Sequence, residues 1–212
     1  MGWKCSVVFG SLAPPPLQDR SPRPPRHDAN AALALAADCG LGALTPAHET
    51  DLCYGIYPHE NQEVVIAAAA DGSFASLGDC RRLAGSEGVA LSPSNDPRVQ
   101  AMLRRFPSGV VLACELHSVV DFWAFALFDR GRLIRQAAGS ADDGILINHG
   151  SPIPEESDQA IPAAEDSETQ FDGESMVFRV ASRIFGQPLD QVPLEDWQAT
   201  VFQRARPWWK FW

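Results

Sequence analysis

The stretch GVVLACELHSVVDFWAFALFDRGRLIRQAAGS, residues 109–140, is the longest run of strand-forming sequence in the chain. Its β-branched and aromatic residues are typical of strands inside a sheet. The sequence DRGR at 129–132 interrupts the run with a turn signal, so residues 121–128 and 132–138 are expected to form an antiparallel hairpin. The stretch therefore predicts a mainly antiparallel sheet.

The segments on either side of this hairpin supply further elements. Strands are expected at 4–11 and 51–58, with a strand or the start of a helix at 63–72. Capping residues, proline at a first turn and one-sided apolar patterns predict helices at 28–40, 96–106, 174–186 and 193–206. The proline-rich stretch 13–27 is expected to be a surface loop.

This order of elements predicts an α+β fold, with a mainly antiparallel sheet, helices packed on one face and a C-terminal helical segment. The expected division has three parts. An α+β domain spans 1–150, an acidic, proline-containing loop spans 151–172, and C-terminal helices with an aromatic tail at 173–212 pack on the same domain.

The composition is that of a globular protein. Of 212 residues, 45% are hydrophobic and 21% are charged, which suffices for one domain with a real core. No run approaches the roughly 20 apolar residues that cross a bilayer, and MGWKCSVVFG lacks the features of a secretory signal. We therefore expect a cytoplasmic protein with no membrane association. The five cysteines are scattered, without zinc-like spacing.

The net charge of −10 is concentrated in one segment. Between Gln136 and Phe178 there are ten acidic residues and no lysine or arginine, which leaves 17 of the 27 acids to balance the 17 bases elsewhere. Nucleic acid is not an expected ligand, because its phosphates favour the opposite charge. A basic protein partner, or a divalent cation, suits this segment. The acids expected to face a partner are Asp142, Asp143, Glu155, Glu156, Asp158, Glu165, Asp166 and Glu168.

The tail RPWWKFW, 206–212, adds a second possible contact. One interpretation is that it folds back and covers the sheet or a helix groove, since exposed aromatic patches promote aggregation. The other is that Trp208 and Trp209 anchor a partner, because tryptophan dominates binding hot spots.

His117 and Asp121 are the most obvious pair for proton transfer. In a regular strand, residues four apart share a face but lie about 13 Å from each other, whereas a base and its orienting acid need a hydrogen bond. We therefore expect structural roles for both. Cys114 is not expected to be a nucleophile served by His117, because residues three apart on a strand point to opposite faces.

An enzymatic alternative remains. A metal-assisted hydrolase could use His117, Asp121, Asp142, Asp143 and His149, provided that the fold brings them into one pocket. The sequence has neither a GxSxG motif nor an HExxH motif, and no metal or cofactor is expected from its spacings.

The segment LHSVVDFWAFALFDRGRLIRQAAGSADDGILINHG, residues 116–150, resembles an uncharacterised bacterial family of unknown function with a motif similar to HSVVDWFAYA. The matching residues are His117 to Ala126, followed by Gly131, Arg135, Asp143, Gly144 and Ile145. Residues 173–190 resemble the closing helix of that family, and the opening 1–11 is a weaker match. Trp and Phe are exchanged at 122–123. The resemblance supports the fold and implies no activity.

Charge segregation and the lack of catalytic motifs together favour a non-catalytic protein that binds another protein. The most concrete version is an immunity or antitoxin protein that neutralises a bacterial toxin through its acidic loops.

Overall fold

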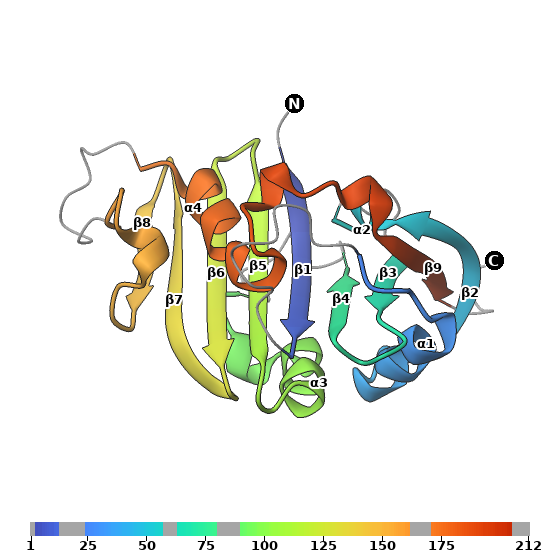
Figure 1. Ribbon diagram of the computed structural model, residues 1–212. Helices are drawn as coiled ribbons and strands as arrows, with labels where there is room; N and C mark the ends of the chain where they lie inside the picture. Colours follow the sequence, from blue (N-terminus) through green and yellow to red (C-terminus); the bar gives the residue numbers. More distant parts are fainter. Residues whose placement is uncertain (1–2, 13–23, 57–62, 80–89, 162–170, 205–212) are drawn as a thin grey trace.

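The chain folds around one nine-stranded antiparallel sheet with the strand order β2-β9-β3-β4-β1-β5-β6-β7-β8 (Figure 1). This computed structural model describes residues 3–12, 24–56, 63–79, 90–161 and 171–204. The strands are β1 Lys4–Ser11, β2 Leu44–Asp51, β3 Glu63–Ala68, β4 Phe74–Gly78, β5 Val110–His117, β6 Phe122–Asp129, β7 Arg132–Ser140, β8 Gly144–His149 and β9 Gln198–Arg204. The expected α+β fold with an antiparallel sheet is confirmed.

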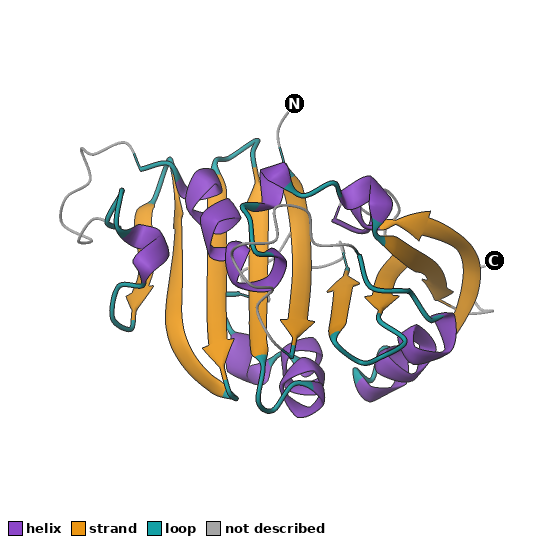
Figure 2. Ribbon diagram, viewed as in Figure 1, coloured by secondary structure: helices purple, strands orange, loops and turns teal. Residues whose placement is uncertain are grey.

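Helices cover both faces of the sheet, not one (Figure 2). The α-helices are α1 Ala29–Asp38, α2 Leu52–Ile56, α3 Pro97–Arg105, α4 Gly173–Val180 and α5 Ser182–Phe185. Residues of α2, α4 and α5 join one apolar cluster, and residues of α1 and α3 join another. The central strands require this arrangement, because consecutive residues such as Val7 and Val8 are buried on opposite faces.

The expected hairpin is confirmed as β6 and β7, which pair from Asp129↔Arg132 to Trp123↔Gly139 with a register shift between Leu127 and Phe128. Arg130 and Gly131 form its turn with φ values of 49° and 75°. Positive φ at both central residues is the geometry that matches the twist of paired strands.

The assumption that His117 and Asp121 lie in one regular strand was wrong. The chain reverses at 118–121, and β5 pairs with β6 from Val110↔Asp129 to His117↔Phe122. His117 therefore ends one strand while Asp121 lies in the turn, so the separation of about 13 Å expected for a regular strand does not apply.

Two other segments differ from their expected elements. Residues 52–56 form helix α2, where a strand was expected. This helix packs closely on β4, since a Cβ on Gly78 would lie 2.1 Å from the Gly55 carbonyl oxygen. Residues 198–204 form strand β9 between β2 and β3, where a helix was expected.

The helices α1 and α3 begin where their caps predict. Asp28 accepts hydrogen bonds from the backbone N–H groups of Asn30 (2.8 Å) and Ala31 (3.2 Å). Asp96 caps α3 by accepting from the Arg98 N–H at 2.8 Å, with Pro97 as the first helical residue. The C-terminal helix is confirmed as α4 and α5.

Four aromatic rings fix the face covered by α5. Phe185 lies 5.1 Å from Phe9 and 5.2 Å from Trp197, both edge-on, and 5.8 Å from Phe74 between ring centroids. Phe74 and Trp197 also meet edge-on at 4.8 Å. These contacts join α5 to β1, β4 and the start of β9.

Among the described residues, no helix has the length and apolar character that crossing a membrane requires.

His27 links the segment before α1 to the sheet and makes stability depend on pH. Its Nε2 lies 2.8 Å from Thr200 Oγ1, and its Nδ1 lies 3.2 Å from the Ala68 backbone. Desolvation by burial lowers the pKa of His27, despite an opposing backbone hydrogen bond at Ala68.

The unfolded chain therefore binds a proton at His27 more readily than the folded chain does. The stabilising contribution of neutral His27 is fully present above the ordinary histidine pKa of about 6.5. This contribution is lost as the pH falls below about 6.5 toward the lower pKa of the folded state. In urea unfolding between pH 7.5 and 5, we expect the free energy of unfolding to fall less steeply in His27→Gln than in the parent. The exposed His48→Gln is the control, and equal slopes in all three proteins would contradict the assignment.

Candidate functional site

The acidic segment does not face outward along its whole length. Glu156 is buried, and its carboxylate accepts hydrogen bonds from Arg135 Nε at 2.6 Å and Nη2 at 3.0 Å. The side chains of Arg135 and Glu156 are 2% and 1% exposed. The expectation that Glu156 meets a partner is therefore wrong: the burial of Arg135 on β7 demands an internal carboxylate.

Glu155 is also engaged inside the molecule. Arg183 of α5 donates from Nε and Nη2 to the Glu155 carboxylate at 2.5 and 2.9 Å. These hydrogen bonds with Glu155 raise the pKa of Arg183 against the opposing effect of burial. Glu155 is thus a half-buried structural acid, and not the outward-facing contact that was expected.

The other expected contacts divide into two groups. Asp142, Asp143 and Asp158 are exposed, as expected. The remaining residues, Glu165, Asp166, Glu168, Trp208 and Trp209, lie outside the described residues, as do most of the proline-rich stretch and the aromatic tail.

Five carboxylates gather at one end of the sheet. β5 and β7 run in the same direction, so the turns that follow them, 118–121 and 141–143, lie at the same end, at the top of the sheet in Figure 1. Helix α4 starts at this end too, because its first residue, Gly173, packs on Trp123 near the start of β6. The contact is so close that a Cβ on Gly173 would lie 2.0 Å from the Trp123 ring. We call this set the acidic end: Asp121, Asp142, Asp143, Asp172 and Glu174.

No described arginine, lysine or histidine forms an ion pair with the acidic end. Asp172 is occupied as the cap of α4, where it accepts from the Ser175 N–H at 3.0 Å. Asp143 accepts a hydrogen bond from the Ser140 hydroxyl at 3.0 Å. These neutral partners orient the two carboxylates without pairing them with a basic side chain of the described residues.

Three carboxylates of the acidic end, those of Glu174, Asp172 and Asp121, interact electrostatically. Burial raises the pKa of Glu174, and the negative charges of Asp172 and Asp121 raise it further, whereas a backbone hydrogen bond at Trp3 and the positive charge of the amino terminus oppose them. A cation at this end would be attracted by several segments at once.

The 118–121 turn adds apolar surface at the same end. Val119 and Val120 are 71% and 46% exposed. Sequence reasoning missed them, because two β-branched residues in an apolar run favour a strand. Asp121, with its positive φ of 45°, completes the turn; aspartate tolerates this conformation better than most residues.

One residue of the enzymatic alternative, His149, lies apart from the others. Asp142 and Asp143 precede β8, whereas His149 ends that strand, about 20 Å from Asp143 at the usual rise per residue. The structure shows no hydrogen bond between His117 and Asp121, and the buried Nδ1 of His117 has no hydrogen-bond partner. Within the described ranges, no three histidine, cysteine or acidic side chains are grouped so that they could hold a metal ion.

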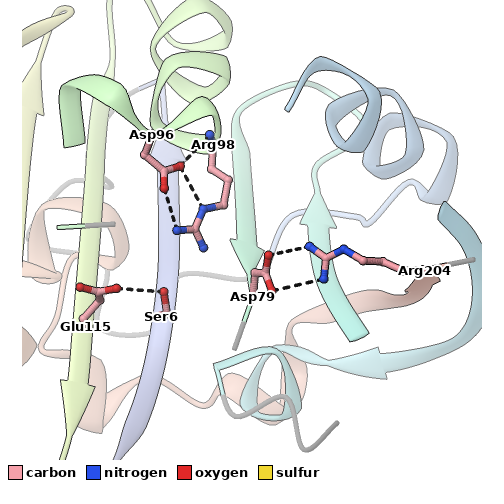
Figure 3. A network of polar contacts seen from close by, with 6 residues as sticks. All are labelled: Ser6, Asp79, Asp96, Arg98, Glu115 and Arg204. Carbon is pink, nitrogen blue, oxygen red and sulfur yellow. Dashed lines mark hydrogen bonds and ion pairs between the residues drawn. The ribbon is translucent and has the colours of Figure 1, made fainter. Parts of the chain in front are cut away.

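A second polar cluster lies beneath α3, on the face opposite α4 and α5 (Figure 3). Arg98 makes a two-pronged contact with Asp96, from Nε at 3.0 Å and from Nη2 at 2.8 Å. The Ser6 hydroxyl donates to Glu115 at 3.2 Å across β1 and β5. Arg204 of β9 pairs with Asp79 at 2.7 Å. Sequence reasoning missed this cluster, although a glutamate within the apolar run LACEL is an unusual core residue.

This cluster joins α3 to the sheet. Burial disfavours the charge of Arg98, but the hydrogen bonds with Asp96 and the charges of Asp96, Asp79 and Glu115 outweigh it, so the pKa of Arg98 is raised. Arg98 and Asp96 are only 2% and 3% exposed. Because the acids and arginines of this cluster interact with one another inside the molecule, we assign the cluster to stability.

The fold and the acidic end define an α+β protein with one central antiparallel sheet and a charged, solvent-facing end. The chain belongs to the family of unknown function DUF6928, whose model matches residues 18–186. The resemblance to a family of unknown function is thereby confirmed at this level. No curated protein and no solved structure shows significant similarity to the chain.

Proposed function

We propose that this protein is a non-catalytic binding protein that docks a basic protein on its acidic end. In its most concrete form, it is a cytoplasmic immunity or antitoxin protein whose acidic end enters the basic cleft of a bacterial toxin. The surface that contacts the partner is one end of the sheet and not the whole acidic segment, because Glu155 and Glu156 are paired with Arg183 and Arg135 inside the molecule.

One observation carries the proposal: carboxylates from three separate segments meet at one end without a described cationic partner. Like charges in proximity repel, and the repulsion from Asp172 and Asp121 adds to the larger effect of burial in raising the pKa of Glu174. A cationic surface relieves that repulsion on binding. Complementary charge also accelerates encounter and makes association sensitive to salt.

The test removes charge while preserving the turns. Asp121, Asp142 and Asp143 are exposed and can each be changed to asparagine, which tolerates the positive φ at 121 and can still accept a hydrogen bond at 143. We expect the triple variant to bind the basic partner isolated from the native host at least ten-fold more weakly than the parent at low salt. We also expect a shallower salt dependence. Isothermal titration calorimetry at two ionic strengths measures both.

The matched control removes three exposed acids from other parts of the molecule. Asp38→Asn, Glu49→Gln and Asp190→Asn together change the net charge by the same amount, on α1, on β2 and before Gln191. We expect this control to bind like the parent. Equal weakening in both triple variants means that only total charge matters, and unchanged binding in the first excludes the acidic end as the docking site.

A further inference from the structure

The 118–121 turn presents the most exposed large apolar side chain among the described residues. Val119 is 71% exposed and its neighbour Val120 is 46% exposed. The other exposed large apolar side chains occur singly on separate segments: Leu12, Leu33 and Leu146. Two adjacent valines at the tip of one turn therefore form a distinct apolar surface, and such surfaces mark interaction sites when polar residues surround them.

This apolar tip is held in place before any partner arrives. The Ser118 N–H donates to the Trp3 carbonyl at 2.9 Å, and the Val120 N–H donates to the His117 carbonyl at 3.1 Å. Trp3 is itself fixed by an edge-on contact with Phe178 of α4, with ring centroids 4.9 Å apart. A turn that is already ordered loses little conformational freedom on binding, which favours affinity.

The tip lies within the acidic end. Asp121 follows Val120 directly, and Asp121 acts electrostatically on Glu174 at the start of α4. The β7–β8 turn with Asp142 and Asp143 is two strand spacings away, about 10 Å. Apolar side chains enclosed by charge resemble the arrangement of binding hot spots, where a central anchor is surrounded by polar contacts.

We propose, on the basis of the proposed function, that Val119 and Val120 form the apolar anchor of the acidic end. Its partner is then a basic protein surface with an apolar recess that takes the two valines. Charge complementarity selects this partner over a second copy of the chain, whose acidic end would repel this one.

Two probe peptides of equal charge distinguish apolar binding to Val119 and Val120 from electrostatic attraction to the acidic end. One alternates five lysines with glycines, and the other has two of these glycines replaced by leucine. The acidic end supplies attraction to both peptides, whereas only the second offers apolar groups to the valines. Fluorescence anisotropy at low ionic strength gives the affinities, and amide chemical shifts locate the peptides on the protein.

We expect the leucine-containing peptide to bind at least five-fold more tightly than the glycine peptide. In Val119→Ser/Val120→Ser, we expect this preference to disappear while binding of the glycine peptide stays unchanged. The control Leu33→Ser, on the exposed side of α1, keeps the preference. Both serine changes are at exposed positions, so folding should not be affected.

The outcomes distinguish this inference from the proposed function. If the double serine variant retains the preference for the leucine-containing peptide, Val119 and Val120 are not the anchor. The acidic end remains the docking site in that case if the triple asparagine variant binds both peptides more weakly than the parent. If that triple variant weakens neither, the proposed function itself fails. A sedimentation coefficient that is larger for the parent than for the double serine variant identifies a second copy as the occupant and overturns the inference.

Discussion

Replacing Glu156 with alanine should lower the free energy of unfolding by about 3–5 kcal/mol, which is the usual cost of breaking a buried ion pair from one side. The change leaves the Arg135 guanidinium buried without its carboxylate. It also removes the hydrogen bond that the Ile153 N–H donates to the same carboxylate at 3.2 Å. Urea unfolding followed by circular dichroism measures the difference.

Two further variants show whether charge is responsible. Glu155→Ala removes the half-buried acid that pairs with Arg183, and it should cost distinctly less because that pair is closer to solvent. Arg135→Leu/Glu156→Leu removes both charges and should recover part of the lost stability. Recovery stays incomplete because Arg135 Nη1 also donates to the carbonyl oxygens of His149 and Gly150, at 2.9 and 3.3 Å. A loss below about 1 kcal/mol in Glu156→Ala would show that the pair contributes little.

Phe185→Ala should destabilise the protein by a comparable amount, about 3–5 kcal/mol, because it opens a cavity among buried aromatic rings. Phe185 is fully buried against Phe9, Phe74 and Trp197. For a protein of this size, the loss corresponds to a decrease in melting temperature of about 6–20 °C. Thermal unfolding by calorimetry measures it.

Leu33→Ala is the matched control, since it shortens an apolar side chain that is 42% exposed on α1. Its melting temperature should stay within about 2 °C of the parent. A similarly small effect in Phe185→Ala would mean that the aromatic cluster can close over the missing ring.

The elements that could be predicted from sequence carry their signals locally. Strand β1 contains the apolar run Val7–Phe9, α1 and α3 have their caps in the sequence, and the turn of the β6–β7 hairpin has a glycine at one of its two positions with positive φ. In each case, neighbouring residues determine the conformation.

The elements that were missed depend on contacts far along the chain. Residues 198–204 are compatible with a helical pattern, but they fill the gap between β2 and β3, with Val201 opposite both His48 and Val65. Val119 and Val120 favour a strand by composition, yet the chain must reverse there to pair β5 with β6. Such tertiary requirements override local preference.

The candidate site was predictable only in part. The exposed positions of Asp142 and Asp143 follow from a polar turn sequence. The ion pairs of Glu155 with Arg183 and of Glu156 with Arg135 could not be predicted from sequence. Both arginines lie beyond the ends of the segment that lacks basic residues. Counting charges along the sequence located the excess of acid, but it could not show which carboxylates the fold uses internally.

The position of β9 has a consequence for the synthesis of the protein. Strand β2 pairs only with β9, and β3 would be an edge without it. Strand β9 is the last of the described strands to be synthesised, so a growing chain cannot complete this sheet until about residue 204 has left the exit tunnel. Until then the apolar edge of β3, with Val64 and Ile66, is open to pairing with other nascent chains.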